Sequence, residues 1–370
     1  MFRSFLAILL AAYLMFSASA PGAFAGDDDL EIWDVIESVS PQATPSIYQS
    51  DGSTLITVTC TGDFTIGGDT RKRKNIFEDE LAAQGGDINF TMRNMRDILM
   101  SDDLTLVNFE GTLTDSESVP AAKKNNEFIF SAPPAYVSML SDNGIEAVAL
   151  ENNHVMDHGQ EGLDDTKAAL RGAGIVYSDS TELGVIEVKG TQIAMLSYHC
   201  IDRWDQLWDK VPQDIRTAKE MYPIVIVSFH WGYEKHYEPS SNQLKMGRLA
   251  ADAGADLVIG NHSHRMQPIE YYNGVYICYS LGNFCFSGNS KPSDMNSIVF
   301  QTRFRVSKDG VVTNRGFRII PIHISSRQDR NDFIPTVVTS QTNIDAILTT
   351  LKSNGKKLEY AVPDYPLTWN

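Results

Sequence analysis

The sequence is short of positive charge. It has 31 Lys and Arg residues against 47 Asp and Glu residues among 370, which gives a formal net charge of −16. Proteins that bind phosphate backbones need a basic face, so this deficit argues against nucleic acid as a partner. The same charge would repel any polyanion unless a metal ion or a local basic patch intervenes.

The sequence begins with an apolar stretch that is too short to cross a membrane as a helix. Residues 5–16 are almost wholly apolar and follow Arg3, but a spanning helix needs ~20 such residues. Small residues at 18, 20 and 23–25 then offer cleavage sites, so residues 1–25 are predicted to be a signal peptide. An uncleaved membrane anchor is the alternative. The chain is therefore expected to be exported, extracellular or in the cell envelope, with residues 26–54 as a linker.

Cysteine is scarce. Four cysteines in an exported chain permit three disulfide pairings, but Cys60 and Cys278 lie inside apolar runs, where free Cys often packs as a small hydrophobe. No bridge is predicted. Because no two cysteines have CxxC spacing, a thiolate zinc site is not expected either.

What the sequence does contain is a recurring pattern of short apolar runs that end abruptly in polar residues, alternating with helical stretches. This alternation predicts an α/β layered fold over residues 55–325, followed by a C-terminal extension at 326–370. In such folds polar sites gather where several strands end together. The polar residues that follow the runs are Gly62-Asp63, Asn108-Phe109-Glu110-Gly111, Asn152-Asn153-His154, His230, Gly260-Asn261-His262-Ser263-His264 and Ser280-Leu281-Gly282-Asn283.

Other segments are assigned more simply. Helices are predicted at 90–100, around 138–140, and at 163–173, 242–253 and 343–352. A hairpin is predicted at 181–198 and late strands at 298–306 and 311–324. The polar segment 112–135 is predicted to be a long loop near the site.

Three histidines are candidate metal ligands. His262 and His264 lie two residues apart just beyond an apolar run, and imidazoles so placed can converge on neighbouring metal ions. Alone, they could equally be surface residues. His230 ends another apolar run, and its parallel position favours a ligand role for all three.

Several oxygen donors and one further histidine accompany them. Asp63 and Glu110 could accept loop amides, or could supply the negative charge of a divalent site, with one of them bridging two metals. Asn153 offers an amide oxygen, and His154 a titratable imidazole. Asp157 could orient His154 or could be a helix N-cap.

In this order, the six peptides resemble the CapA family of capsule (poly-γ-glutamate) biosynthesis proteins, over about residues 55–325. The resemblance implies a metallophosphatase-like four-layer α/β/β/α sandwich with two mixed β-sheets. It implies that His154 protonates a leaving group. It also implies one or two divalent metals, with Mn²⁺, Fe²⁺ and Zn²⁺ about equally suited, held by Asp63, Glu110, Asn153, His230, His262 and His264.

Two positions depart from calcineurin-type phosphatases. Asp63 is followed by Phe64 and Thr65 instead of completing an Asp-x-His motif, and Glu110 stands where a bridging Asp is usual. CapA proteins share both departures. One metal site would therefore lack an imidazole and bind more weakly.

Two functions remain open at this point. In the first, the chain is a metal-dependent hydrolase of a phosphoester or of a γ-glutamyl amide in a capsule polymer, with His154 as general acid and Asp157 beside it. In the second, it is a non-catalytic accessory that grips the polymer or a membrane synthase complex. Fold alone does not decide between them.

Overall fold

The computed structural model describes residues 49–123 and 128–369, which belong to one structural unit, residues 47–370. The predicted signal peptide and most of the predicted linker lie outside the described residues. Among the described residues, no helix has the length and apolar character needed to cross a membrane.

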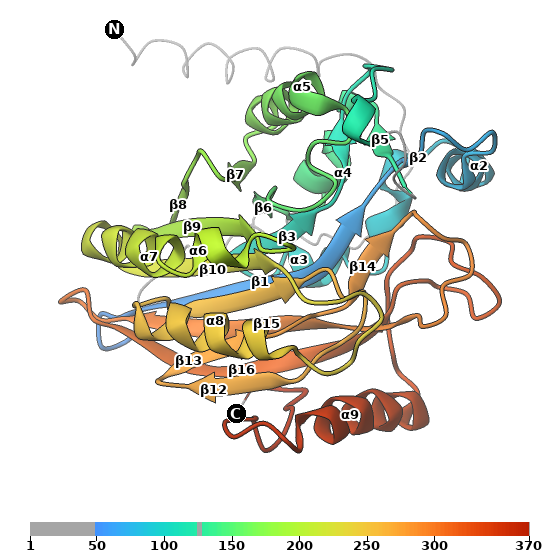
Figure 1. Cartoon of the computed structure of the whole chain (residues 1–370). Helices are drawn as coiled ribbons and strands as arrows, with labels where there is room; N and C mark the ends of the chain where they lie inside the picture. The colour runs from blue at the N-terminus through green and yellow to red at the C-terminus, as the bar shows by residue number, and fades with distance from the viewer. Residues whose placement is uncertain (1–48, 124–127, 370) are drawn as a thin grey trace, which may run out of the picture. The chain divides into compact units, whose positions relative to one another are not determined.

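Two mixed β-sheets form the centre of the structure (Figure 1). The first sheet has the order β17 (Thr336–Val337), β16 (Val312–His323), β15 (Asn296–Val306), β1 (Thr54–Thr65), β3 (Leu104–Phe109), β6 (Ala147–Ala149) and β7 (Val176–Ser178), with β14 (Asn283–Phe286) also paired to β1. The second has the order β12 (Ile269–Tyr272), β13 (Val275–Cys278), β11 (Leu257–Asn261), β10 (Ile224–His230), β9 (Thr191–His199) and β8 (Gly184–Val188). In each sheet parallel strands lie beside antiparallel ones.

The strands are apolar on both faces because each sheet is covered on both sides. On β10, Ile224 and Ile226 pack in the core between the two sheets, whereas Val225 and Val227 pack beneath helices. Such continuous apolar runs are typical of sheets buried on both faces. Alternate side chains along each strand therefore pack in two different cores.

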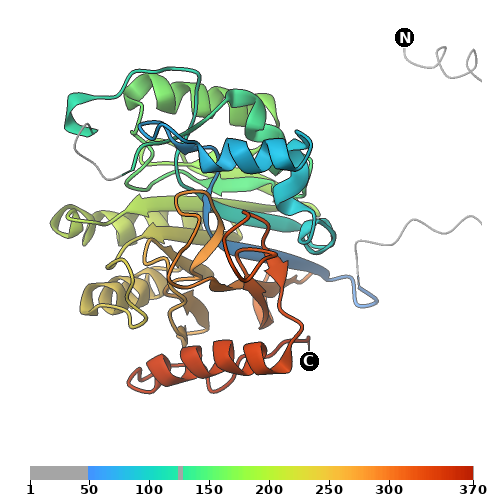
Figure 2. The same ribbon diagram turned by 90° about the vertical axis from the view of Figure 1, so that its right-hand side faces the viewer.

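Helices cover the outer face of each sheet (Figure 2). Helices α2 (Ile76–Ala83), α4 (Ser138–Ser141) and α5 (Gly159–Gly172) contribute to the core on the first sheet. Helices α7 (Lys210–Met221) and α8 (Ser241–Asp252) do so on the second. The order helix, sheet, sheet, helix confirms the predicted four-layer α/β/β/α sandwich.

The C-terminal segment closes the core between the sheets. Helix α9 (Gln341–Gly355) buries Ile347 and Leu351 in that core. The tail then bonds to both sheets: the amide of Tyr271 donates to the carbonyl of Tyr360 at 2.9 Å, and that of Ile319 to the carbonyl of Pro366 at 2.8 Å. This segment is an integral part of the packing.

The segment 112–135, predicted as a loop, contains regular structure. Strands β4 (Thr112–Leu113) and β5 (Phe130–Ala132) pair with each other, and β5 also pairs with β2 (Gly68–Asp69) to form a third, small sheet. Short helices η2 (Ala121–Lys123) and η3 (Pro134–Val137) lie on either side of β5. The pairing satisfies backbone groups that a loop would leave to water.

Of the other local predictions, some are confirmed and some are wrong. The predicted hairpin is the antiparallel pair β8–β9. The predicted helix at 90–100 is split into η1 (Ile88–Met92) and α3 (Arg96–Leu99), and α2, α6 (Trp204–Leu207) and α7 were not foreseen. All four cysteines are free and buried.

Candidate metal centre

The candidate site lies where strands of both sheets end. Strand β1 runs parallel to β3 and β14, which places Asp63 opposite Asn108 and Asn283. Backbones come unusually close here: a Cβ on Gly62 would lie 1.9 Å from the carbonyl oxygen of Gly282. Glycine at 62 is therefore a steric requirement for bringing β1 against the chain that leads into β14.

Asp63 is fully buried and is held by three neighbours. Its Oδ1 accepts from Asn108 Nδ2 at 2.8 Å and from the His262 amide at 3.3 Å, and its Oδ2 lies 2.9 Å from His264 Nδ1. Burial lowers the pKa of His264, but the Asp63 and Glu110 carboxylates outweigh it and raise that pKa to about 9. The Oδ1 of Asn283 lies 2.8 Å from the same Nδ1.

Glu110 carries two buried carboxylate oxygens that accept no hydrogen bond from the described residues. The residue is 1% exposed, and burial together with the nearby Asp63 charge raises its pKa to about 7. Ligand atoms of Asp63, Glu110 and His264 all lie within 4.8 Å of one another. Because unsatisfied buried carboxylate oxygens are costly, this arrangement calls for a cation between them.

A second group, with residues from both sheets, adjoins Glu110. His230 Nε2 lies 2.7 Å from Asn153 Oδ1 and 3.6 Å from Glu110 Oε1. The rings of His230 and His262 are 4.7 Å apart, and His262 Nδ1 is buried without a hydrogen-bond partner among the described residues. Burial and neighbouring histidines lower the pKa of His262 to about 4 and that of His230 well below its usual value. These shifts favour the neutral form of both imidazoles, which is the form that binds metals.

The loop after β11 is strained where it presents His262 and His264, two of the candidate ligands. His262 and His264 have φ angles of 93° and 52°, in the left-handed region that costs a non-glycine residue about 1–2 kcal/mol. Strain of this kind is concentrated at functional sites, where surrounding contacts fix the conformation.

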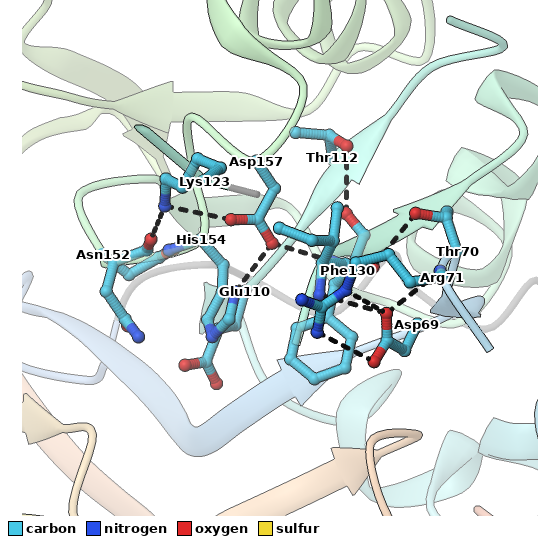
Figure 3. A network of polar contacts seen from close by, with 12 residues as sticks. Asp69, Thr70, Arg71, Glu110, Thr112, Lys123, Phe130, Asn152, His154 and Asp157 are labelled. Carbon is cyan, nitrogen blue, oxygen red and sulfur yellow. Dashed lines mark hydrogen bonds and ion pairs between the residues drawn. The ribbon is translucent and has the colours of Figure 1, made fainter. Parts of the chain in front are cut away.

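His154 and Asp157 form a pair at the edge of this group (Figure 3). His154 Nδ1 lies 2.7 Å from Asp157 Oδ2. That carboxylate is fully buried and also accepts from the Phe130 amide at 2.8 Å and from Lys123 Nζ at 3.0 Å. Lys123 Nζ donates to the Asn153 carbonyl as well. Asp157 therefore orients His154, and His158 occupies the N-cap position of α5.

A cavity of about 150 Å³ opens beside the site, with His154 and His264 both in its lining. Phe130 packs on His154 with ring centroids 4.6 Å apart, and Phe286 lies 5.0 Å from His264. The histidines at the rim are thus held against an aromatic wall.

Five residues of the site were not singled out from the sequence. Asn108 and Asn283 belong to the six peptides that follow apolar runs, but were not themselves proposed as site residues. His199, at the end of β9, follows an apolar run in the same way as His230, so the sequence pattern could have identified it. Its ring lies 6.0 Å from that of His230. Lys123 and Phe130 come from the segment predicted as a loop, where no sequence pattern marked them.

The residues present fit a divalent transition metal. The donors are carboxylates, one amide and imidazoles, a mixture suited to Mn²⁺, Fe²⁺ or Zn²⁺. The bare oxygens of Glu110 and the bare Nδ1 of His262 are the atoms whose burial such an ion would offset.

The four layers form a metallophosphatase-like fold, with a cluster of histidines and carboxylates at the strand ends. Within that class, the chain belongs to the family described as bacterial capsule synthesis protein PGA_cap, whose model matches residues 57–288.

Curated relatives agree with this assignment. The chain is 32% identical to the PGA biosynthesis protein CapA of Bacillus subtilis over 247 residues, 61% of this chain and 63% of that protein. It is 27% identical to the capsule biosynthesis protein CapA of Bacillus anthracis over 276 residues, 67% of this chain and 64% of that protein. The match thus spans less than two thirds of the length of either relative.

Among solved structures, the NAD nucleotidase of Haemophilus influenzae is similar with a TM-score of 0.41 and 13% identity, over 86% of this chain and 65% of that one. At this score the fold assignment rests on the strand order and the three cores described above.

Proposed function

We propose that the chain is an exported, metal-dependent hydrolase of capsule or poly-γ-glutamate biosynthesis. The observation that carries the proposal is the buried, unbonded carboxylate of Glu110 among neutral histidines, with an oriented His154 at the rim. The relatives are named for capsule and PGA biosynthesis, which supports the polymer, and the residues of the site support the chemistry.

The donor set divides around Glu110. Asp63, Glu110 and His264 would hold one ion, and Glu110 would share a second with Asn153, His230 and His262. Bound ions would polarise the scissile group and lower the pKa of an attacking water. The first site has a single imidazole, so it is the weaker of the two.

His154 would serve as general acid. His154 Nδ1–H would donate a hydrogen bond to the buried Asp157 carboxylate, which fixes the ring and leaves Nε2 to deliver a proton to the leaving group. Lys123 and the Phe130 amide hold Asp157 in turn, so the pair is positioned before substrate arrives. A phosphoester or a γ-glutamyl amide could each receive this proton.

The test compares His154→Ala with His323→Ala, a histidine on β16 away from the cluster. We expect His154→Ala to keep its metal and melting temperature while its turnover falls ~10²–10⁴-fold, the usual share of general acid catalysis. The loss should shrink for substrates with good leaving groups, which need no proton.

Two results would contradict the proposal. One is absence of metal by elemental analysis after purification without chelators and after titration. The other is a destabilised His154→Ala variant whose rate per folded molecule is unchanged; a non-catalytic accessory that grips the polymer would then be the better assignment.

A further inference from the structure

The cavity beside His154 and His264 has one apolar side and one cationic side. The apolar side consists of three phenylalanines: the Phe130 ring lies 5.5 Å from that of Phe128 and 6.2 Å from that of Phe286. The other residues of the lining are Glu234, Lys235, Arg265, Asn283, Asn289, Pro292 and Ser293.

Arg265 is a fixed cation in this lining. It is 7% exposed, its Nη1 donates to the His264 carbonyl at 2.8 Å, and its Nη2 donates to Ser293 Oγ at 2.6 Å. The guanidinium also lies 5.7 Å from the Tyr237 ring. Arg265 forms no ion pair with any acid among residues 49–123 and 128–369, so no carboxylate there neutralises its charge.

Lys235 is the second cation, and its backbone is held in place. Its φ angle is 63°, and its amide donates to the Ser263 carbonyl at 2.7 Å, which ties the loop after β10 to the loop after β11. A left-handed non-glycine residue is strained and persists because its surroundings fix it. The exposed ammonium has no carboxylate partner within the described part of the chain.

The lining therefore reverses the charge of the molecule locally. Among the described residues of the lining, Glu234 is the one acid against two cations, in a chain whose net charge is −16. The nearby Asp294 is already engaged, because Tyr237 Oη donates to its Oδ2 at 2.6 Å and the Asn296 amide to its Oδ1 at 2.9 Å. An anionic substrate would meet this basic patch beside the metal ligands.

We propose that this cavity recognises a carboxylate of the substrate through Lys235 and Arg265, while the phenylalanine side packs on adjoining methylenes. The inference rests on the proposed function and names its substrate class: a γ-linked glutamyl chain, which carries a free carboxylate a few methylenes from each amide bond. Lys235 is then a specificity-determining residue separate from the metal ligands and from His154.

The experiment measures binding of two labelled γ-glutamyl tetramers to the metal-loaded full chain by fluorescence anisotropy. One tetramer has free carboxylates, and in the other they are amides. The variants are Lys235→Gln, Lys235→Arg, and Lys308→Gln, an exposed turn lysine that matches the charge change.

We expect Lys235→Gln to bind the acidic tetramer about tenfold or more weakly, the effect of losing one charge-assisted hydrogen bond. Lys235→Arg should restore most of the affinity, and all the variants should bind the amide tetramer alike. Equal affinities of Lys235→Gln and Lys308→Gln for the acidic tetramer would overturn the inference. So would an equal loss for both tetramers.

Failure of this inference can be told apart from failure of the proposed function. A wild-type chain that holds metal and cleaves a generic phosphodiester, but does not prefer the acidic tetramer, would reject only the carboxylate site. A chain that holds no metal would reject the proposed function, and the Lys235 comparison would still decide the carboxylate site.

Discussion

At the scale of single residues, the candidate site consists of groups that the fold alone does not satisfy. Asp63 Oδ1 accepts from Asn108 Nδ2, and its Oδ2 lies 2.9 Å from His264 Nδ1, but neither oxygen of Glu110 accepts a hydrogen bond from the described residues. A buried carboxylate without donors costs free energy, and its raised pKa expresses that cost. Residues that lower the stability of the fold and are grouped at one place indicate a functional site more strongly than residues that only stabilise the fold.

The sequence predicts candidate site residues where they end or directly follow a buried strand. His230, His262 and Glu110 all do so, and the structure brings them together. The partners Asn283 and Lys123 were not readable, because their positions depend on β14 pairing with β1 and on a segment whose pairing is non-local. Periodicity carries no information about such long-range contacts.

Asp102, at the opposite ends of the strands from the site, offers a residue-scale test of pH dependence. Burial raises its pKa to about 7, although Thr105 Oγ1 donates to it at 2.8 Å. Because the folded state then binds a proton that the unfolded state has released, stability should fall as pH rises from about 4 to 7. Asp102→Asn removes this loss, so the variant should be more stable than wild type at pH 8, by roughly 1–3 kcal/mol.

Urea unfolding at pH 4.5 and pH 8 measures the effect, with the exposed turn variant Asp309→Asn as control. The gain should be present at pH 8 and shrink towards pH 4.5. A gain of the same size at both values would show that the Asp102 charge is not its source.

At the scale of elements, the sequence predicted strands better than helices. Strands buried on both faces have an unmistakable apolar run, as β10 does. Helix α7 was not foreseen because its sequence is polar apart from a narrow stripe that includes Val211 and Ile215. The sequence does not predict the short strands β4 and β5, because a strand of two or three residues is too short to show a hydrophobic period.

Helix α9 provides the element-scale prediction. Leu351 is fully buried in the core between the sheets, so Leu351→Ala should destabilise the fold by about 2–5 kcal/mol. Thr349→Ala, on the exposed side of the same helix, should change stability by less than about 0.5 kcal/mol. Denaturant midpoints with unchanged slopes would establish the difference, and equal midpoints would mean that α9 is not part of the cooperative core.

At the scale of the whole molecule, the candidate metal centre joins the two sheets. Asp63 lies on β1 and Glu110 follows β3, both in the first sheet, whereas His230 ends β10 and His262 and His264 follow β11 in the second. Ions held between these residues would connect the two sheets at the strand ends, in addition to the contacts made by α9 and the C-terminal tail. Metal occupancy and global stability should therefore be coupled.

The last prediction follows from that coupling. A ligand that binds only the folded state at 100 times its Kd stabilises by about 2.7 kcal/mol, so removing metal with a chelator should lower the melting temperature by several degrees and adding Mn²⁺ back should restore it. In Glu110→Gln the shared carboxylate is lost, so the shift on metal addition should largely disappear. The metal-free variant should nevertheless melt at or above metal-free wild type, because an unbonded buried charge has been replaced by a neutral amide. Scanning calorimetry of both proteins, with and without metal, measures all four states.

Two outcomes would contradict the assignment of Glu110 as a shared ligand. One is a wild-type melting temperature that does not respond to metal. The other is a metal-free Glu110→Gln chain that melts far below metal-free wild type.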